Sequence, residues 1–192
     1  MKALWQFWEQ GITEKVVDEI NSLAEEFEQT VGQTGFEKAA EINQEKRRAK
    51  IRWIKADSPQ SQSLLNLLHY FFQQANQEIF GTNISSITDI QHTLYEAENK
   101  GHYDFHMDTF LQTERMVHRK LSMTIQLSDS DDYEGGDFEF DKHYAPNIPD
   151  KNLLRKKGAV LIFPSVLGHR VTPVTKGARK SLVTWIDGPL WR

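Results

Sequence analysis

Four polar residues that could bind a metal ion alternate along one short segment: His102, Asp104, His106 and Asp108. Alternate residues of a β-strand point to the same face, so the sequence predicts that these four side chains share one face. A strand with one face in solvent is the ordinary interpretation of such a run. Imidazole and carboxylate groups are also common ligands of iron and zinc, so the segment is a candidate part of a metal site.

A third candidate ligand, His169, follows another segment that is predicted to be a strand. The apolar run 160–163 ends at Pro164, and His169 then begins a further segment that continues to Val174. Two histidines and one carboxylate on a β-scaffold form a facial triad that leaves metal positions open, as in non-haem Fe(II) oxygenases. The same ligand types can hold a catalytic zinc ion with a bound water. The ligands alone therefore leave an oxygenase and a hydrolase open.

Arg179 is the residue that could distinguish these chemistries. It lies just past the predicted hairpin turn 175–177, at the start of the last predicted strand. A guanidinium holds a carboxylate with two parallel hydrogen bonds. 2-Oxoglutarate needs such an anchor, because its keto-acid end chelates iron while its other carboxylate lies farther away. A solvated turn arginine, close to Lys176 and Lys180, is the alternative that the spacing leaves open.

The elements that must position these residues differ between the two parts of the chain. In the first part, apolar residues recur at helical spacing and predict helices over about 13–29 and 58–81. The second helix has Ser58 at its N-cap and Pro59 as its first helical residue, both of which favour helix initiation. A short strand is predicted at 51–55.

From Ile87 onward the apolar segments become short and are separated by turn residues. The predicted strands cover 87–96, 102–108, 119–127, 136–140, 158–163, 168–174 and 180–186. Many short strands without intervening helices indicate antiparallel pairing and a sandwich or barrel. The sequence therefore predicts a mainly β protein with N-terminal helices: helical support over about 1–85 and a β core over about 86–188, within a single domain 1–192.

Composition narrows the class of protein. The chain has 192 residues, a formal net charge of −4, 39% apolar residues and 26% charged residues, which is typical of a folded globular protein. The absence of cysteine excludes a cysteine nucleophile, a disulfide and a cysteine-ligated cluster. A pI near 6.0 disfavours a nucleic-acid partner. With no signal-like or membrane-spanning apolar run, we expect a cytoplasmic protein with no membrane contact.

Three blocks of sequence, in order, carry a resemblance to a known family. They are Tyr103–Asp108, which fits Tyr-x-x-His-x-Asp; the segments 121–128 and 131–136; and 163–179, with Trp185 beyond it. The chain resembles the Fe(II)/2-oxoglutarate dioxygenases of the prolyl 4-hydroxylase superfamily, and most closely the PKHD-type hydroxylases. The resemblance covers about residues 46–188.

The resemblance implies a double-stranded β-helix (jelly-roll) core. It implies Fe(II) and 2-oxoglutarate as cofactors, O2 as co-substrate and ascorbate as a supporting reductant. It implies that His106, Asp108 and His169 are the catalytic iron ligands, and that Tyr103 lies three residues before the first of them. It also implies that Arg179 anchors 2-oxoglutarate and that Tyr103 is a second contact to it.

The same resemblance implies a hydroxylase that acts on a C–H bond, of a prolyl or other residue in a peptide or protein; a small-molecule substrate is the alternative. Some prolyl hydroxylases of the superfamily carry lysine in place of Arg179, so prolyl hydroxylation is not fixed. We expect segments 109–118 and 141–156 to border the site and contact the substrate. Two other interpretations stay open: a metal-dependent hydrolase on a jelly-roll barrel and a non-catalytic jelly-roll binding module.

Other notable residues are expected to be structural. We expect His118 and His143 on the surface and His69 in local contacts on its helix. Trp185 is expected in the core, and 135–136 in a tight turn because two glycines follow each other. The basic run 45–48 is expected to be a solvated face.

Overall fold

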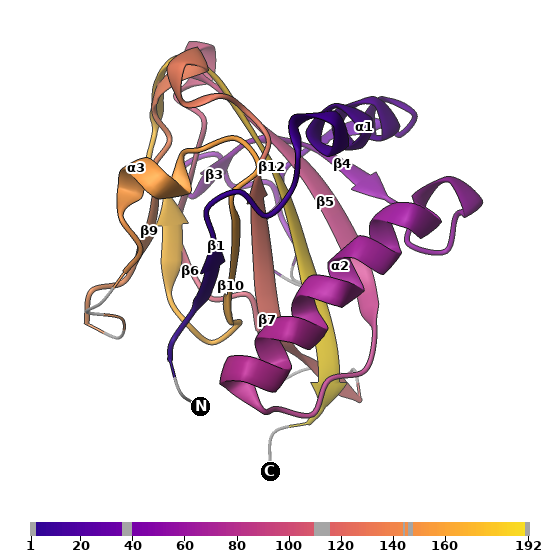
Figure 1. Ribbon diagram of the computed structural model, residues 1–192. Coiled ribbons are helices and arrows are strands. Elements are labelled where there is room, and N and C mark those ends of the chain that lie inside the picture. The colour runs from indigo at the N-terminus through magenta and orange to yellow at the C-terminus, as the bar shows by residue number, and fades with distance from the viewer. Residues whose placement is uncertain (1–2, 36–39, 110–115, 144, 146–147, 191–192) are drawn as a thin grey trace.

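The structure is a computed structural model that describes residues 3–35, 40–109, 116–143, 145 and 148–190 (Figure 1). In these ranges the chain forms two β-sheets, a main sheet of eight strands and a minor sheet of four. Every strand pairing is antiparallel. The mainly β, jelly-roll architecture expected from the sequence is confirmed.

The strand order of each sheet brings distant segments together. The main sheet follows the order β1 (Gln6–Trp8), β10 (Val160–Pro164), β7 (Val117–Gln126), β12 (Val174–Pro189), β5 (Ile87–Glu96), β4 (Lys50–Ile54) and β2 (Gln29–Val31), and β8 (Tyr133–Gly135) pairs with the beginning of β12. The minor sheet follows the order β3 (Arg47–Arg48), β6 (His102–His106), β11 (His169–Val171) and β9 (Phe138–Phe140). Both segments that carry the candidate metal ligands therefore lie side by side in the minor sheet.

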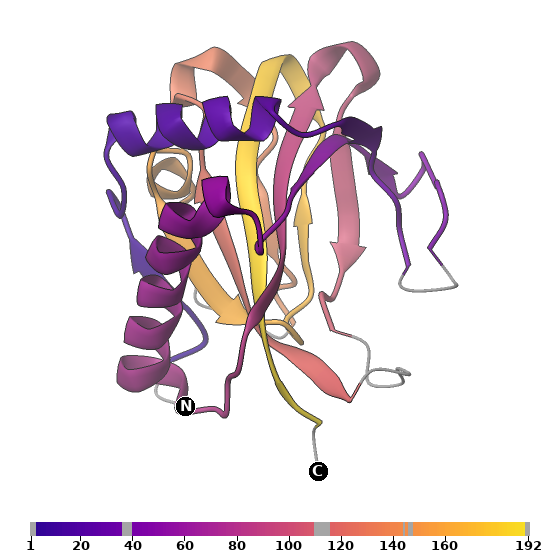
Figure 2. The ribbon, with the colours of Figure 1, turned by 90° about the vertical axis from the view of Figure 1, so that its right-hand side faces the viewer.

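Two helices cover the outer face of the main sheet, as Figure 2 shows. Helix α1 (Glu14–Glu25) begins where the Thr13 side chain accepts a hydrogen bond from the Val16 backbone. It ends earlier than the predicted residue 29, because Arg52 of β4 donates to the Phe27 carbonyl and the chain then enters β2. The end of α1 is thus set by a contact with the sheet.

The second helix confirms the start and stop that the sequence predicts. Pro59–Ser61 forms a 3-10 turn that leads into α2 (Gln62–Ala75) and then a π-turn (Asn76–Phe80). Gly81 ends it in the left-handed conformation, at φ 59°. Short helical turns elsewhere are Ala97–Asn99, Ser130–Asp132 and α3 (Lys151–Leu154).

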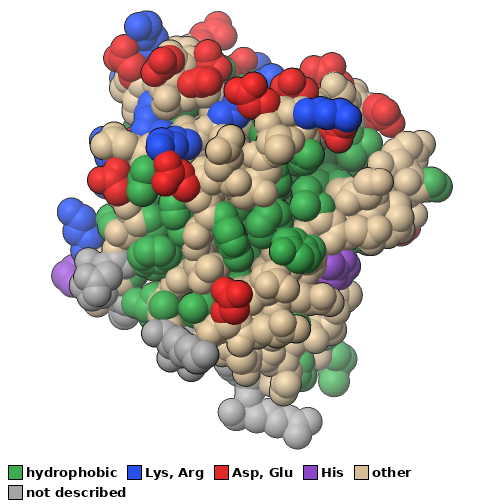
Figure 3. All heavy atoms as spheres, in the orientation of Figure 1, with side chains coloured by type: hydrophobic (Ala, Val, Ile, Leu, Met, Phe, Trp, Pro, Cys, Tyr) green, Lys and Arg blue, Asp and Glu red, His purple; other side chains and the backbone are tan. Residues whose placement is uncertain are grey.

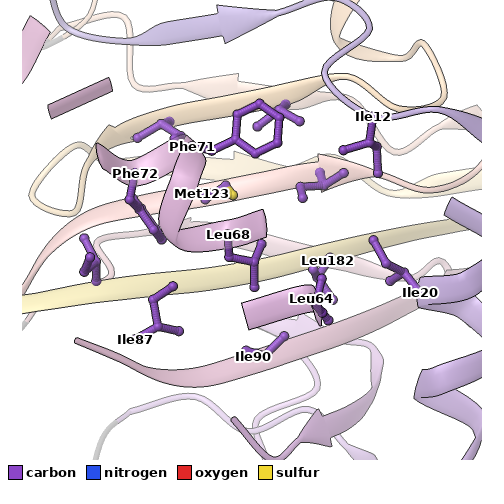
Figure 4. Packing of buried hydrophobic residues seen from close by; sticks show 14 of the residues in the cluster. Ile12, Ile20, Leu64, Leu68, Phe71, Phe72, Ile87, Ile90, Met123 and Leu182 are labelled. Atoms are coloured by element: carbon purple, nitrogen blue, oxygen red, sulfur yellow. The ribbon is translucent and has the colours of Figure 1, made fainter. Parts of the chain in front are cut away.

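The hydrophobic core lies between these helices and the outer face of the main sheet (Figure 4). Leu68 and Phe72 of α2 are fully buried, as are Ile90 of β5 and Leu182 of β12. Burying one such side chain contributes about 1.5–3 kcal/mol. The core therefore anchors both helices to β5, β7 and β12, the strands whose other face borders the cavity.

Strand β12 serves the core and the cavity at once. Leu182 and Ile186 belong to the core beneath the helices, whereas Arg179, Ser181 and Trp185 line the cavity on the inner face. Successive side chains of a strand point to opposite faces, so one strand can do both. The predicted hairpin turn at 175–177 is wrong, because this segment belongs to β12, and Gly177, although its φ is 66°, pairs with Tyr133 of β8.

Strands β1, β2 and β3 were not predicted. They have three, three and two residues, too few to show a periodic pattern. Gly135 and Gly136, where a tight turn is expected, do have positive φ values of 70° and 61°, but Gly135 is still part of β8 and only Gly136 and Asp137 separate that strand from β9.

The surface in the view of Figure 3 has charged side chains of both signs along its upper rim and hydrophobic side chains in its middle. Within the described ranges, no helix is long and apolar enough to span a membrane.

Candidate active site

A cavity of about 480 Å³ lies between the two sheets and contains the residues singled out by their chemistry. Its walls include residues from both sheets and from the segment between β2 and β3. The lining residues used below are Val31, Arg47, Trp53, Asp89, Tyr95, Tyr103, His106, Met107, Asp108, Arg119, Met123, Phe138, Phe163, His169, Arg179, Ser181 and Trp185.

A register shift in the minor sheet decides which side chains of β6 face this cavity. His106 pairs with His169, and Tyr103 pairs with Val171. Three residue steps on β6 therefore match two steps on β11, which is the effect of one extra residue in a strand. Because opposite residues in an antiparallel pair share a face, Tyr103 and His106 both point into the cavity.

The expectation that His102 and Asp104 share the face of His106 is therefore wrong. The ring nitrogens of His102 lie 2.9 Å from the carbonyl oxygens of Lys100 and Glu45. The Asp104 carboxylate accepts a hydrogen bond from the Phe105 backbone. The extra residue in β6 breaks the alternation on which the expectation rested.

Three of the predicted site residues do come together. Ligand atoms of His106, Asp108 and His169 all lie within 4.8 Å of one another. His106 Nε2 is 3.6 Å from Asp108 Oδ1, and His169 Nε2 is 3.4 Å from Asp108 Oδ2. These separations leave room for one ion between the three groups.

Hydrogen bonds fix the orientation of each ligand. His106 Nδ1 lies 2.8 Å from the Asp104 carbonyl oxygen, and His169 Nδ1 lies 2.9 Å from the Leu167 carbonyl oxygen. A carbonyl only accepts, so each Nδ1 carries the proton and each Nε2 keeps its lone pair toward the cluster. This is the arrangement that a metal-binding histidine requires.

The carboxylate has its own support from β7 and the loop after β10. Ser122 Oγ donates to Asp108 Oδ2 at 2.7 Å and lies 2.9 Å from Ser165 Oγ. The Asp108 backbone also donates to the Ser165 carbonyl at 2.9 Å. Sequence reasoning missed both serines, because nothing in the local pattern of 121–128 marks Ser122 as facing Asp108.

Two of the three groups, Asp108 and His169, have the protonation states that metal binding needs. Burial acts to raise the pKa of Asp108, but the neighbouring His169 and His106 outweigh it and hold that pKa well below its usual range. Burial lowers the pKa of His169 to about 4, partly opposed by the Asp108 charge. At neutral pH the site therefore offers an ionised carboxylate and a neutral imidazole. These residues fit a divalent metal ion.

Arg179 lies deep in the same cavity. Its side chain is 4% exposed, and it donates one long hydrogen bond, of 3.4 Å, to Ser181 Oγ. Among the described residues it forms no ion pair, and its guanidinium lies 5.7 Å from the centre of the Tyr95 ring. A buried cation without a counter-ion is costly, so this position fits an anionic ligand such as a carboxylate.

Two tyrosines lie near these groups. The Tyr103 ring stacks on the His106 ring, with centroids 3.5 Å apart and planes 13° apart. Burial raises the pKa of Tyr103 to about 12. Tyr95, which pairs with Arg179 across β5 and β12, was not predicted as a site residue. Its position in the alternating polar series of 89–95 was the available signal.

The cavity wall also contains an ion pair, Arg119 with Asp89, that packs on the ring of Trp185. Arg119 donates to Asp89 Oδ2 at 2.9 Å, and its guanidinium lies 3.7 Å from the centre of the Trp185 ring. The Trp185 ring is 6.4 Å from that of Trp53. Trp185 is buried as expected, but it lines the cavity rather than the core beneath the helices.

The rim of the cavity is apolar and exposed. Val31, Trp53 and Met107 line the cavity and remain 46%, 43% and 55% exposed. The expectation for segment 141–156 is wrong for its described residues, since none of them lines the cavity. The segment after β2 lines it instead. Residues 110–115 of the other expected segment lie outside the described residues.

The remaining expectations have mixed outcomes. The basic run 45–48 is not a uniformly solvated face, because Arg47 is 6% exposed and lines the cavity. His118 is buried in β7 rather than on the surface, because β7 begins earlier than predicted. His143 is exposed, and His69 bonds locally to the Leu65 carbonyl, as expected.

The amino-acid sequence matches one family model and a set of similar proteins. Residues 90–187, half of the chain, match the model described as the 2OG-Fe(II) oxygenase superfamily. A PKHD-type hydroxylase of Synechococcus sp. (strain CC9311) is 40% identical over 95 residues, which cover 49% of this chain and 40% of the relative. A PKHD-type hydroxylase of Psychrobacter sp. (strain PRwf-1) is 32% identical over 99 residues, 49% of this chain and 37% of the relative. The chain thus matches less than half the length of these relatives.

Solved structures share the fold. A prolyl-4-hydroxylase from Pseudomonas putida superposes with a TM-score of 0.68 at 18% identity, covering 97% of this chain and 93% of that one. A prolyl hydroxylase from Trichoplax adhaerens, in complex with a hypoxia inducible factor peptide fragment, gives a TM-score of 0.72 at 17% identity, covering 96% and 84%. At these identities the comparison establishes the architecture.

Proposed function

Because the chain belongs to the 2OG-Fe(II) oxygenase superfamily, we propose that it is an Fe(II)- and 2-oxoglutarate-dependent hydroxylase. One observation carries the proposal: a two-histidine, one-carboxylate cluster and a buried guanidinium without an ion-pair partner among the described residues line the same cavity. A catalytic metal ion for hydrolysis needs only the cluster, whereas 2-oxoglutarate also needs a cation that holds its distal carboxylate, and the buried guanidinium fits that role.

We propose that His106, Asp108 and His169 hold Fe(II) and that Arg179 holds the distal carboxylate of 2-oxoglutarate. The bound iron and 2-oxoglutarate, together with O2, would supply the oxidising chemistry that converts a C–H bond to C–OH. The chain supplies position. Arg179 would form two charge-assisted hydrogen bonds to the carboxylate. Tyr95 and Tyr103 line the same cavity, and in this proposal their hydroxyls add to the contact.

The protein also keeps the site dry. Phe138 and Phe163 pack against His169, with ring centroids 5.4 Å and 4.7 Å away. Excluding water strengthens the interactions of charged groups inside the cavity, which favours tight binding of a dianionic co-substrate.

For the substrate we propose a prolyl or other residue within a peptide or protein. The support is the exposed apolar rim of Val31, Trp53 and Met107, which offers contact area outside the cavity for the neighbours of the reacting residue. The Trichoplax adhaerens prolyl hydroxylase with a bound peptide fragment has the same architecture. We further propose that residues 1–192 act as one domain, because the helices and the cavity share strands β5, β7 and β12.

The test is the conversion of 2-oxoglutarate to succinate by the purified chain. We expect Fe(II)-dependent succinate formation that increases when a substrate peptide is present, and no such product with zinc in place of iron. Arg179→Ala should lose this activity at low 2-oxoglutarate and keep the metal. A chain that binds iron but forms no succinate, with or without peptides, would instead be a binding module.

A further inference from the structure

The two histidines of the metal cluster are held in very different surroundings. His169 is 6% exposed and packs against the rings of Phe138 and Phe163. His106 lies at the open side of the cluster, with 17% of its side chain exposed. The His106 ring contacts two other rings: it stacks on Tyr103 and lies tilted against His169. The orientation of His106 therefore depends on how firmly Tyr103 is held.

Arg47 holds the other side of Tyr103. Its guanidinium carbon lies 4.4 Å from the centre of the Tyr103 ring, within the range of a cation–π interaction. Arg47 and Tyr103 are direct partners in the pairing of β3 with β6, so they share a face of the minor sheet. The three side chains form a stack in the order Arg47, Tyr103, His106.

The guanidinium itself is fixed in place. Its Nη1 donates to the Gln33 carbonyl at 2.9 Å, and the side chain is 6% exposed. A Cβ atom at Gly32 would lie 2.8 Å from Arg47 Nε and 3.2 Å from the Ala49 carbonyl oxygen. The glycine thus leaves the space that the guanidinium occupies. Among the described residues, Arg47 forms no ion pair that would explain its burial.

We propose that Arg47 is a positioning residue for the metal site: it presses the Tyr103 ring against His106 and so fixes the plane of that iron ligand. This inference rests on the proposed function, because it assumes that His106 binds the metal. Residues that orient a metal-binding histidine typically change metal affinity by about 10–100-fold when they are replaced. Arg47 would act through Tyr103 and would not touch the metal.

The experiment measures binding of Co(II), as a spectroscopic probe of the site, to the full chain without 2-oxoglutarate. The ligand-field absorption of Co(II) reports the geometry of its ligands, and its titration gives the dissociation constant. We expect Arg47→Met to weaken Co(II) binding about tenfold and to change the absorption spectrum. Arg47→Lys, which keeps a cation over the ring but loses the planar guanidinium, should fall between Arg47→Met and the unchanged protein.

Arg48→Met is the matched control. Arg48 follows Arg47 in β3 and bonds to the Gln44 and Asn99 carbonyls rather than to Tyr103. It should keep the Co(II) affinity and spectrum of the unchanged protein. Thermal unfolding of each variant shows whether it folds. If Arg47→Met does not fold, Gly32→Ala displaces the same guanidinium without removing it and should weaken Co(II) binding in the same way.

A double-mutant cycle with Tyr103→Leu tests the route of the effect. Since Arg47 acts through Tyr103, Arg47→Met should cause little further loss of Co(II) affinity in the Tyr103→Leu protein. An equal loss with and without Tyr103 would overturn the proposal, as would a folded Arg47→Met protein with unchanged affinity and spectrum. If the unchanged protein binds no Co(II), the metal site itself is refuted, and the proposed function fails with it.

Discussion

Replacing Arg179 with Met should affect stability and ligand binding in opposite directions. The Arg179 side chain is buried, has one hydrogen bond of 3.4 Å and forms no ion pair among the described residues. A buried charge without a partner destabilises the folded state. Methionine keeps an apolar chain in the same space without the charge. The free energy of unfolding without ligand should therefore stay the same or rise.

Binding of 2-oxoglutarate should fall sharply in the same variant. A hydrogen bond to a charged group is worth about 1.5–3 kcal/mol, which corresponds to about 10–150-fold in affinity. Two such bonds to one carboxylate place the expected loss near the upper end of that range. Arg179→Lys keeps the charge but cannot form the planar pair of bonds, so it should recover only part of the affinity.

Thermal unfolding with Co(II), with and without 2-oxoglutarate, measures both quantities at once. A ligand that binds only the folded state raises the unfolding temperature, and this rise should nearly vanish in Arg179→Met. Arg52→Met is the control, because Arg52 bonds to the Phe27 carbonyl outside the cavity. It should lower ligand-free stability and keep the full rise. A large loss of ligand-free stability in Arg179→Met, or an undiminished rise, would refute the reasoning.

Three further predictions follow from the site and its surroundings. Ser122→Ala removes the 2.7 Å hydrogen bond to Asp108 and should weaken metal binding about tenfold, as measured by Co(II) titration; unchanged affinity would contradict a positioning role for Ser122. Burial lowers the pKa of His92, like that of His169, from 6.5 to about 4, so the unfolded state binds more protons in this interval and stability should fall as pH drops through it. His92→Gln should make that fall shallower in urea unfolding at about pH 7 and about pH 5, and an unaltered pH dependence would count against it. Trp53→Ala should reduce peptide-stimulated succinate formation more than peptide-independent formation, and an equal reduction of both would remove the rim from substrate binding.

The sequence predicted secondary structure best where a hydrophobic pattern extends over many residues. Strand β5 was predicted at its observed bounds, Ile87–Glu96. The helical segment that contains α2 was also predicted, from Ser58 to Gly81. Both elements show local periodicity, which a single chain displays directly. The choice of His106, Asp108 and His169 instead came from the family resemblance, because alternation alone placed His102 and Asp104 on the same face.

What the sequence did not reveal depends on contacts between distant segments. Arg47 lies in a basic run that reads as a solvated surface, and β3 has only two residues. It is buried because β3 pairs with β6, a contact between residues 47 and 103. Ser122 likewise contacts Asp108 only because the minor sheet lies against β7. No local pattern contains either fact.

The extra residue in β6 links the metal cluster to the stack beside it. In a regular pairing, with Tyr103 and His106 an odd number of residues apart, these two side chains would point to opposite faces. Neither the 3.5 Å stack on His106 nor the cation–π contact with Arg47 could then form on the cavity side. No glycine within Tyr103–His106 indicates an irregular strand in the sequence. Periodicity therefore predicted, wrongly, that His102 and Asp104 share a face with His106. The same irregularity that defeated the prediction is what places an aromatic ring behind a metal ligand.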